Sequence, residues 1–288
     1  MSNSDNIDKA TVDSFGTEWS EFSQDSLNEL EHNQMFQSYF GIFPWDALPK
    51  KAEGFDMGCG SGRWAKLVAE RVFKLNCVDP SAAALEVARK NLSDMSNVNF
   101  LNNGVSDCVL LDESQDFGYS LGVLHYIPDT EEAMASCTRL LKPAAPFLVY
   151  LYFRFDNKPK WYAWLWSASN LVRKLVSKAP EKTKLLITNF IAAFIYYPLA
   201  RAALLGKKLG LRLGKKLGLR VENWPLSSYR ANSFYTMRTD SRDRFGTPLE
   251  HRFTRIEITK MMENCDLENI TFSPNFPFWC MVGYKKTK

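Results

Sequence analysis

The chain has 288 residues, of which 45% are hydrophobic, and a formal net charge of +4, values that indicate a globular protein with one large core or one core and an added lobe. The six cysteines stand apart without a CxxC pair, and only three histidines accompany them. These counts argue against a zinc cluster, so no metal is predicted, and they favour reduced thiols in the cytosol.

The charge is unevenly distributed along the chain. Residues 154–220 hold 15 Lys and Arg against two acids, a local charge of +13, so the rest of the chain carries −9. This asymmetry predicts an appended basic lobe that faces an anionic partner, which could be a lipid, a phosphate-bearing substrate or a nucleic acid.

The N-terminal region is polar and lacks the basic and apolar parts of a signal peptide, so no secretion is expected. Aromatic residues recur between positions 15 and 40. This spacing predicts that residues 1–45 form helices that act as a lid or cap. Phe15 and Trp19 are candidates for covering a bound ligand. The alternative is that these aromatics belong to the core.

A glycine-rich turn follows at residues 55–65, FDMGCGSGRWA, between a short apolar segment containing Asp56 and a helical pattern, WAKLVAERV. Gly58, Gly60 and Gly62 let a strand turn sharply into a helix and let backbone N–H groups approach a ligand. Their spacing differs from the dinucleotide fingerprint, and no Lys-Ser/Thr pair follows as in a phosphate-binding loop. Neither a nicotinamide nor a nucleoside triphosphate is therefore predicted.

The next apolar segment, FKLNCVDPS, ends at Asp79, 21 residues after Gly58. An acid at the tip of a second strand is placed to accept hydrogen bonds from ribose hydroxyls. Ser81 is suited to cap the helix that the following sequence, AAALEVARKNL, predicts.

These features, together with DFGYSLGVLHYIPD at 116–129 and LLKPAAPFLVYLYF at 140–153, resemble the class I S-adenosylmethionine-dependent methyltransferases. The resemblance implies an α/β fold with a Rossmann-like, seven-stranded, mostly parallel sheet flanked by helices, and S-adenosyl-L-methionine bound at the carboxyl ends of strands one to four. Residues 258–286 look like the closing helix and strand pair of that fold. The parts expected are an N-terminal helical cap (1–45), the cofactor-binding core (46–153), a helical basic insertion (154–250) and the closing helix and strands (251–288).

Carried over position by position, the resemblance implies a cofactor site built from the glycine loop and the ends of the next strands. Asp56 and the three glycines would surround the methionine part, and Asp79 would hold the ribose. Val105 stands where the family usually places an acid near adenine, so Asp107, with backbone help from Ser106, is expected to meet the adenine amine. The predicted cofactor-binding residues are Trp19, Asp56, Gly58, Cys59, Gly60, Gly62, Asp79, Pro80, Ser106, Asp107 and Leu121.

His125 lies just after the expected fourth strand and is the candidate catalytic residue, with Tyr126 beside it. If the acceptor is a hydroxyl, a histidine here could take its proton. The alternative is a residue that only shapes the pocket. Methyl transfer from a sulfonium is an in-line displacement in which positioning supplies much of the barrier reduction, and a neutral amine acceptor needs no base.

The insertion begins with RFDNKPKWYAWLWSASNLVRKLVSK, a composition typical of an interfacial membrane helix. The favoured alternative is a substrate-capping helix pair with solvated lysines. The apolar run that starts at Leu185 is interrupted by Asn189, Pro198 and Arg201, which argues against a membrane-spanning helix.

Residues 225–254 are dense in Tyr, Arg and Asp without regular apolar periodicity. This composition predicts a pocket wall that recognises a polar or anionic acceptor, and the alternative is a surface salt-bridge network. The candidate acceptor-binding residues are Tyr229, Arg230, Tyr235, Arg238, Asp240 and Arg244.

The octad LGKKLGLR is written twice in succession at 205–220. An eight-residue period turns an α-helix by about 80° per unit, so no single basic face persists. Each unit also carries two glycines, which weaken a helix. We expect a lengthened, frayed helix end whose second copy, 213–220, can be deleted without loss of cofactor binding.

The sequence thus predicts a cytoplasmic enzyme, a methyltransferase acting on O or N of a small-molecule, sugar or lipid-linked acceptor. Peripheral contact with the inner face of a membrane through 154–220 is a further expectation. One alternative is an RNA methyltransferase with a basic electrostatic arm. SLGVLHYIPD lacks the Asn/Asp-Pro-Pro-aromatic clamp of base-amine methyltransferases, which disfavours a nucleic-acid partner. Another alternative, a non-catalytic cofactor-binding, membrane-peripheral protein, is disfavoured by the intact glycine loop and Asp79. The oligomeric state is not indicated.

Overall fold

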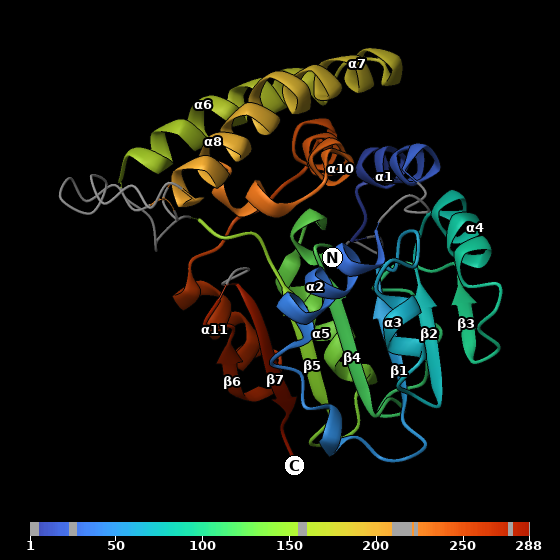
Figure 1. The fold of residues 1–288 in the computed structure, drawn as a ribbon. Coiled ribbons are helices and arrows are strands. Elements are labelled where there is room, and N and C mark those ends of the chain that lie inside the picture. The colour runs from blue at the N-terminus through green and yellow to red at the C-terminus, as the bar shows by residue number, and fades with distance from the viewer. Residues whose placement is uncertain are drawn as a thin grey trace. The chain divides into compact units, whose positions relative to one another are not determined.

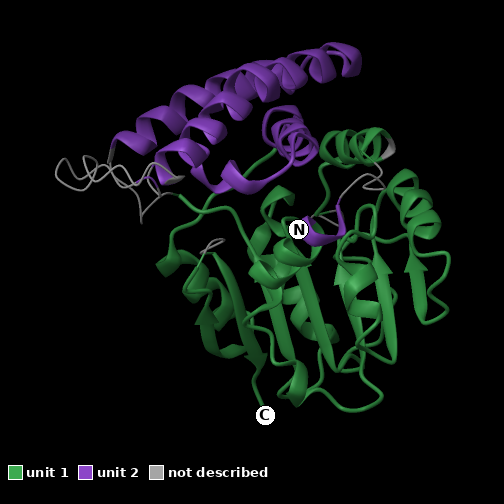
Figure 2. Ribbon diagram, viewed as in Figure 1, with its two compact units in different colours: residues 1–25, 32–154, 249–288 green, residues 26–31, 155–248 purple. Residues whose placement is uncertain are grey.

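The computed structural model describes residues 6–22, 28–154, 160–208, 221, 224–275 and 279–287. The chain divides into two compact units (Figure 2). Unit 1 comprises residues 1–25, 32–154 and 249–288, and unit 2 comprises residues 26–31 and 155–248. The basic insertion therefore makes up most of unit 2.

Unit 1 is built on a seven-stranded sheet with the strand order β3-β2-β1-β4-β5-β7-β6 (Figure 1). Strands β1 to β5 pair in parallel, while β7 runs antiparallel between β5 and β6. This arrangement confirms the expected Rossmann-like fold. The strands are β1 (Glu53–Met57), β2 (Lys74–Val78), β3 (Val98–Leu101), β4 (Phe117–Leu121), β5 (Pro146–Tyr150), β6 (Leu267–Phe272) and β7 (Cys280–Lys285).

Two apolar cores fill the two faces of this sheet, because successive strand residues point to opposite sides. Phe55 and Phe147 belong to the core shared with α5 (Thr130–Leu140) and α11 (Arg255–Asn264). Phe117 and Tyr119 belong to the core shared with α2 (Glu29–Phe40) and α3 (Ala65–Ala69). The helical elements of unit 1 are α1 (Lys9–Glu21), α2 (Glu29–Phe40), η1 (Trp45–Ala47), α3 (Ala65–Ala69), α4 (Ala82–Asn91), η2 (Leu124–Tyr126), α5 (Thr130–Leu140) and α11 (Arg255–Asn264).

The helix ends follow local chemistry. Ser81 caps α4 as expected, its Oγ accepting the N–H of Ala84 at 3.3 Å. Helix α3 is shorter than the pattern WAKLVAERV indicated and ends at Ala69. The helix ends early because the chain joins the sheet at β2, where the N–H groups of Phe73 and Lys74 both donate to the carbonyl of Ala52.

Unit 2 is helical, and its small core lies between α6, α10 and a continuous helix formed by α7, η3 and α8. Helix α10 was not expected, because residues 225–254 lack apolar periodicity. Its buried side is largely polar: Thr236, Thr239, Ser241 and Arg242 are all buried. The elements are α6 (Lys160–Val176), α7 (Glu181–Ile191), the π-helical η3 (Ala192–Tyr196), α8 (Tyr197–Lys208), η5 (Ser227–Ala231) and α10 (Phe234–Gly246).

The segment Glu181–Lys207 has 27 residues and a mean hydropathy of 1.4. By length and composition alone it could cross a membrane, and only 28% of its apolar part is buried. Only the first part of the duplicated octad, residues 205–208, belongs to α8. Residues 209–220, including the copy expected to be dispensable, lie outside the described residues.

Candidate cofactor and active site

The loop between β1 and α3 turns through three glycines that all have positive φ angles, +79° at Gly58, +55° at Gly60 and +77° at Gly62. An L-amino acid is strained in that region, so the backbone itself requires glycine here. The N–H groups of Gly58 and Cys59 donate to the carbonyl of Val78 at 2.7 and 3.1 Å. The loop is therefore anchored to the end of β2.

Asp79 follows β2 and joins this strand end to the glycine loop. Its Oδ2 accepts the N–H of Gly60 at 2.9 Å and its Oδ1 accepts the N–H of Ser81 at 2.8 Å. Burial raises the pKa of Asp79 to about 6, although both hydrogen bonds act in the opposite direction. The acid predicted for the ribose thus stands at the carboxyl end of β2, beside the loop.

Asn102, which the sequence analysis did not single out, connects the end of β3 to the same place. Its Nδ2 donates to the main-chain carbonyls of Asp79 and Pro80, each at 3.0 Å. The predicted residues of β1, β2 and β3 are therefore brought together at one edge of the sheet, in keeping with the rule that parallel strands present their carboxyl ends to the ligand.

Asp56 lies in β1 and is fully buried beneath the loop, where Tyr119 Oη of β4 donates to its Oδ2 at 2.9 Å. Burial raises the pKa of Asp56 to about 8, against the effect of the Tyr119 hydrogen bond and with a smaller contribution from the charge of Asp79. At neutral pH the protonated form of Asp56 therefore predominates. Sequence reasoning missed Tyr119, because the pairing between β1 and β4 is not local.

Two hydroxyl groups at this edge are buried and have no hydrogen-bond partner among the described residues, Ser61 Oγ in the glycine loop and Ser106 Oγ after β3. A buried polar atom without a partner costs about 1–3 kcal/mol, so both atoms are suited to meet polar groups of a ligand. Asp107, expected at the adenine amine, is exposed, and Val105 beside it is buried. Leu121 ends β4 at the same edge.

Helix α1 contacts the glycine loop and the segment that follows β4. A Cβ atom on Gly60 would lie 2.8 Å from Nε1 of Trp19, and the ring of Phe15 lies 4.9 Å from that of Tyr126. Figure 1 shows α1 beside α4 above the carboxyl ends of the strands. These contacts place both predicted aromatics at the expected cofactor edge, and their function as a lid stays a prediction.

His125 lies in η2, directly after β4, with 0% of its surface exposed and neither ring nitrogen hydrogen-bonded among the described residues. Its ring stacks on Tyr152 with centroids 3.9 Å apart, and Tyr126 lies at 4.2 Å. Burial, followed by the positive charge of Arg252 and by His251, lowers the pKa of His125 well below its usual value. The imidazole is therefore neutral at physiological pH.

Other residues near His125 lie just after β5 or in the chain before α11, and sequence reasoning missed them: Tyr152, His251 and Arg252. Arg252 Nε donates to Glu250 Oε1 at 2.8 Å, and its guanidinium lies 4.9 Å from the ring of Tyr152. The main-chain N–H of His251 donates to the carbonyl of His125 at 2.8 Å. One sequence pattern could have indicated Tyr152: Tyr150 and Tyr152 stand two residues apart, so they continue the alternation of side-chain directions along β5.

The six predicted acceptor-binding residues lie in η5 and α10 of unit 2. Several have partners within that unit: Tyr229 packs on Tyr196 at 5.3 Å, and Arg238 Nε donates to Asn189 Oδ1 at 2.9 Å. Acceptor binding by this set therefore stays a prediction. The six residues are Tyr229, Arg230, Tyr235, Arg238, Asp240 and Arg244.

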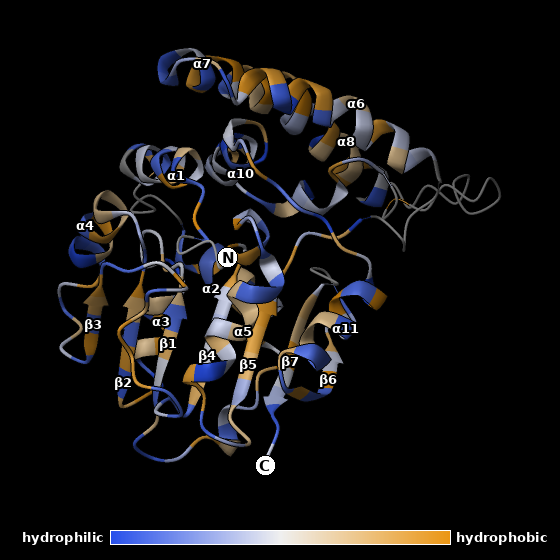
Figure 3. Cartoon of the chain, turned by 180° about the vertical axis from the view of Figure 1, so that it is seen from behind, coloured by the Kyte–Doolittle hydropathy of each residue, from blue (hydrophilic) through white to orange (hydrophobic). Residues whose placement is uncertain are grey.

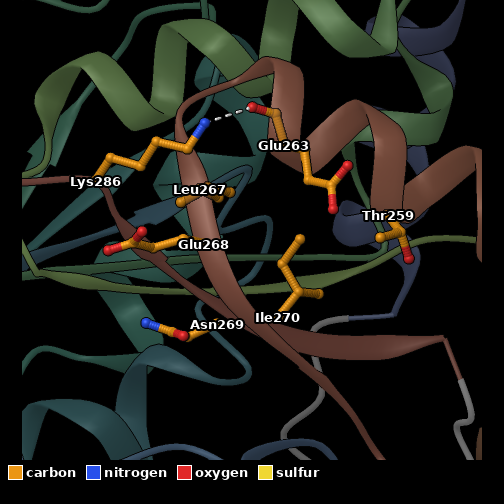
Figure 4. Close-up of a pocket in the computed structure, with 7 residues that line it drawn as sticks. All are labelled: Thr259, Glu263, Leu267, Glu268, Asn269, Ile270 and Lys286. Atoms are coloured by element: carbon orange, nitrogen blue, oxygen red, sulfur yellow. Dashed lines mark hydrogen bonds between the residues drawn. The ribbon is translucent and has the colours of Figure 1, made fainter.

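A shallow hollow of about 530 Å³ lies at the far edge of the sheet, between α11 and β6 (Figure 4). Three strands separate β6 from β1 in the sheet, so this hollow is no part of the site around the glycine loop. Lys286 Nζ donates across it to the main-chain carbonyl of Glu263 at 3.1 Å. Its lining residues are Thr259, Glu263, Leu267, Glu268, Asn269, Ile270 and Lys286.

Comparison with known proteins identifies the domain that carries the site. Residues 55–149 match the family model of a methyltransferase domain. Unit 1 thus contains a stretch that matches a methyltransferase domain. A putative methyltransferase from Bacillus halodurans C-125 has the same fold, with a TM-score of 0.50 and 12% identity over 90% of this chain and 100% of its own.

Two curated methyltransferases are similar in sequence over part of the chain. A ubiquinone biosynthesis O-methyltransferase of Alkalilimnicola ehrlichii is 30% identical over 125 residues, 43% of this chain and 49% of its own. The sterol 4-C-methyltransferase strm-1 of Caenorhabditis elegans is 27% identical over 116 residues, 39% of this chain and 35% of its own. The chain thus matches about half of the first relative's length and about a third of the second's.

The residues at the carboxyl edge fit the cofactor of this domain class, S-adenosylmethionine. The positive-φ glycine loop gives backbone access, Asp79 provides a carboxylate for hydroxyl groups, and Ser61 Oγ and Ser106 Oγ are buried polar atoms without a partner among the described residues. These features occur together at the ends of β1, β2 and β3, where ligands bind in open α/β sheets.

Proposed function

We propose that the chain is an S-adenosylmethionine-dependent methyltransferase that methylates O or N of a small-molecule, sugar or lipid-linked acceptor. The observation that carries the proposal is the glycine loop held against Asp79, with two buried hydroxyls beside it. The methyltransferase-domain match supports the reaction class, and the relatives named for ubiquinone biosynthesis and for sterol methylation support a small-molecule acceptor.

In this proposal the chain's own residues bind and orient the two reactants. Asp79 accepts the ribose hydroxyls, Ser106 and Asp107 meet the adenine, and the Ser61 hydroxyl meets the amino-acid part. Asp56 supports the loop from below. When bound, S-adenosylmethionine supplies a methyl group on a sulfonium that the acceptor attacks in line, so positioning lowers much of the barrier.

His125 serves as the proton acceptor when the nucleophile is a hydroxyl. Its ring is buried and neutral, and stacking on Tyr152 fixes its plane. The same burial and the charge of Arg252 disfavour the imidazolium, which makes His125 a weak base. A weak base is best matched to an acceptor whose proton is already acidic, such as a phenol or an enol.

The proposal also assigns unit 2 to acceptor recognition, through the Tyr, Arg and Asp side chains of η5 and α10. It places the enzyme in the cytoplasm, peripheral at the inner face of a membrane. The positive charge of residues 154–220 supports this location, because anionic headgroups line that face.

The test is to incubate the pure protein with methyl-labelled S-adenosylmethionine and a cell extract, and then to separate organic, aqueous small-molecule, RNA and protein fractions. We expect label in the organic or aqueous small-molecule fraction. Label confined to RNA would contradict the proposal and favour a nucleic-acid methyltransferase. No label in any fraction, with cofactor binding intact, would favour a non-catalytic protein.

A further inference from the structure

The long helix of unit 2, formed by α7, η3 and α8, packs its more polar side into the protein. Lys184, Thr188, Ala192 and Ala203 are all buried on that side, and Thr188 accepts a hydrogen bond from Ser241 Oγ of α10 through its carbonyl at 2.9 Å. A helix at the surface of a water-soluble protein places its large apolar residues in the core and its charged residues outside. Here the buried side holds Ile191 and Tyr196 together with several small and polar residues.

The opposite side of the same helix carries large apolar side chains. Leu186, Phe190 and Phe194 lie four residues apart on one helix face, and all are exposed, Phe190 by 59% and Phe194 by 66%. The rings of Phe190 and Phe194 lie 4.4 Å apart. Burying a leucine or aromatic side chain stabilises a protein substantially, so exposing this row to water is unfavourable. A row of this kind is typical of a surface that binds an apolar partner.

Helix α6 likewise buries a charged side chain and exposes large apolar ones. Arg173 is buried and donates to the carbonyls of Thr247 and Pro248, whereas Trp164, Leu171 and Leu175 are exposed, Trp164 by 83%. Figures 1 and 3 show α6 and the α7–α8 helix on the same side of α10, with apolar positions along both. The exposed apolar residues of the two helices, Trp164, Leu171, Leu175, Leu186, Phe190 and Phe194, are named here the apolar face.

Charge identifies what covers the apolar face. Residues 160–208 contain nine Lys and Arg and a single acid, Glu181, a charge of +8. Lys174, Lys178 and Lys182 are exposed around the turn that joins α6 to α7. A second copy of this unit would repel the first, whereas anionic headgroups would attract it. Tryptophan beside apolar residues and lysines is the composition of a helix in a membrane interface.

We propose that the apolar face of unit 2 inserts into the surface of an anionic lipid bilayer, with α6 and the α7–α8 helix parallel to the membrane plane. Crossing the membrane would carry charges with it, because Lys184 Nζ pairs with Glu181 Oε1 at 2.7 Å and Arg242 pairs with the same carboxylate. Charged side chains within the hydrocarbon are expensive. The in-plane orientation leaves these pairs and the packing on α10 unchanged.

This inference rests on the membrane location given in the proposed function, but not on the methyl transfer, because bilayer binding requires neither cofactor nor acceptor. The test is flotation of the full chain with vesicles of phosphatidylcholine alone, or of phosphatidylcholine and phosphatidylglycerol in equal amounts. We expect binding to the mixed vesicles and release by alkaline carbonate. Equal binding to both vesicles, no binding, or resistance to carbonate, as a spanning helix would show, would overturn the proposal.

Variants distinguish the apolar face from other exposed residues. The double variant Phe190→Ser and Phe194→Ser should lower the partition coefficient roughly a hundredfold. The control Phe73→Ser removes a phenylalanine of unit 1 that is 57% exposed and should leave binding unchanged. Equal loss in both variants, or no loss in either, would overturn the assignment. Because these side chains are exposed, unchanged circular dichroism and Tm are expected in all variants.

Charge variants and the oligomeric state complete the test. Replacing Lys174, Lys178 and Lys182 by Gln should weaken binding to the mixed vesicles roughly a hundredfold, since each cation near an anionic surface contributes a factor of about five. Unchanged binding would contradict the electrostatic part of the proposal. A stable dimer that the Phe190→Ser and Phe194→Ser variant dissociates would show that a second copy covers the face, and would overturn the proposal.

Discussion

Protonation of Asp79 should control the affinity for S-adenosylmethionine. The pKa of Asp79 is raised by burial to about 6, so the free protein loses this carboxylate as the pH falls from 7 to 5. Only the ionised form can accept hydrogen bonds from two ribose hydroxyls with both oxygens. The ionised fraction falls roughly tenfold over this interval, and the affinity should fall by the same factor.

Asp79→Asn should make the affinity nearly independent of pH between 5 and 7. At pH 7 it should weaken binding by about 10- to 150-fold, since hydrogen bonds to a charged group contribute about 1.5–3 kcal/mol. Asp56 does not add to the pH dependence in this interval, because its pKa of about 8 keeps it protonated throughout. Isothermal titration calorimetry across the pH range measures both effects.

Asp116 provides a matched control at the opposite end of the strands. Asp116 Oδ2 accepts the N–H of Glu53 at 2.9 Å, much as Asp79 holds the N–H of Gly60, but it lies before β4. Asp116→Asn should therefore affect thermal stability without changing cofactor affinity. A pH-independent affinity in the unsubstituted protein, or equal loss of affinity in the two variants, would refute the assignment of Asp79.

Four further outcomes are expected. His125→Ala should lower turnover of a hydroxyl acceptor by about 10²–10⁴-fold with unchanged cofactor affinity, and normal turnover in a steady-state assay would remove His125 as the base. The pKa of Asp56 is raised in the folded protein, so the free energy of unfolding should fall as the pH rises from about 4 to about 8. Asp56→Asn should flatten this pH dependence in chemical denaturation. An unaltered pH dependence would contradict the raised pKa of Asp56. Gly60→Ala should cost about 1–3 kcal/mol in thermal unfolding, because φ is +55° and its Cβ would meet Trp19; an unchanged Tm would show that the loop relaxes. Deleting 213–220 should leave the cofactor affinity within error, and a loss measured by calorimetry would contradict the view of this copy as dispensable.

The parts of the site that could be predicted from the sequence depend on short-range backbone requirements. Gly58, Gly60 and Gly62 adopt conformations that other residues avoid, and Ser81 caps a helix three residues away, so both leave a local pattern. Asp79 stands at a fixed distance from that pattern. The spacing therefore indicated the loop and the acid, and the resemblance to a known family implied the fold that positions them.

The parts that could not be predicted depend on contacts between distant residues. Tyr152 meets Arg252 because the chain before α11 pairs with the end of β5, where the N–H of Phe253 donates to the carbonyl of Tyr152 at 2.9 Å. No local period encodes that pairing. Helix α10 was missed for another reason: its buried side mixes Met237 and Phe245 with hydroxyls and Arg242, so no continuous apolar stripe marks it.

The position of the cofactor can be measured directly by hydrogen–deuterium exchange of the full chain with and without S-adenosylmethionine. We expect slower amide exchange at 58–62, 79–81 and 105–107, where the glycine loop and the ends of β2 and β3 meet, and no change at 263–270 beside the hollow between α11 and β6. Binding that protects 263–270 but leaves 58–62 and 79–81 unchanged would contradict the assignment of this edge as the cofactor site.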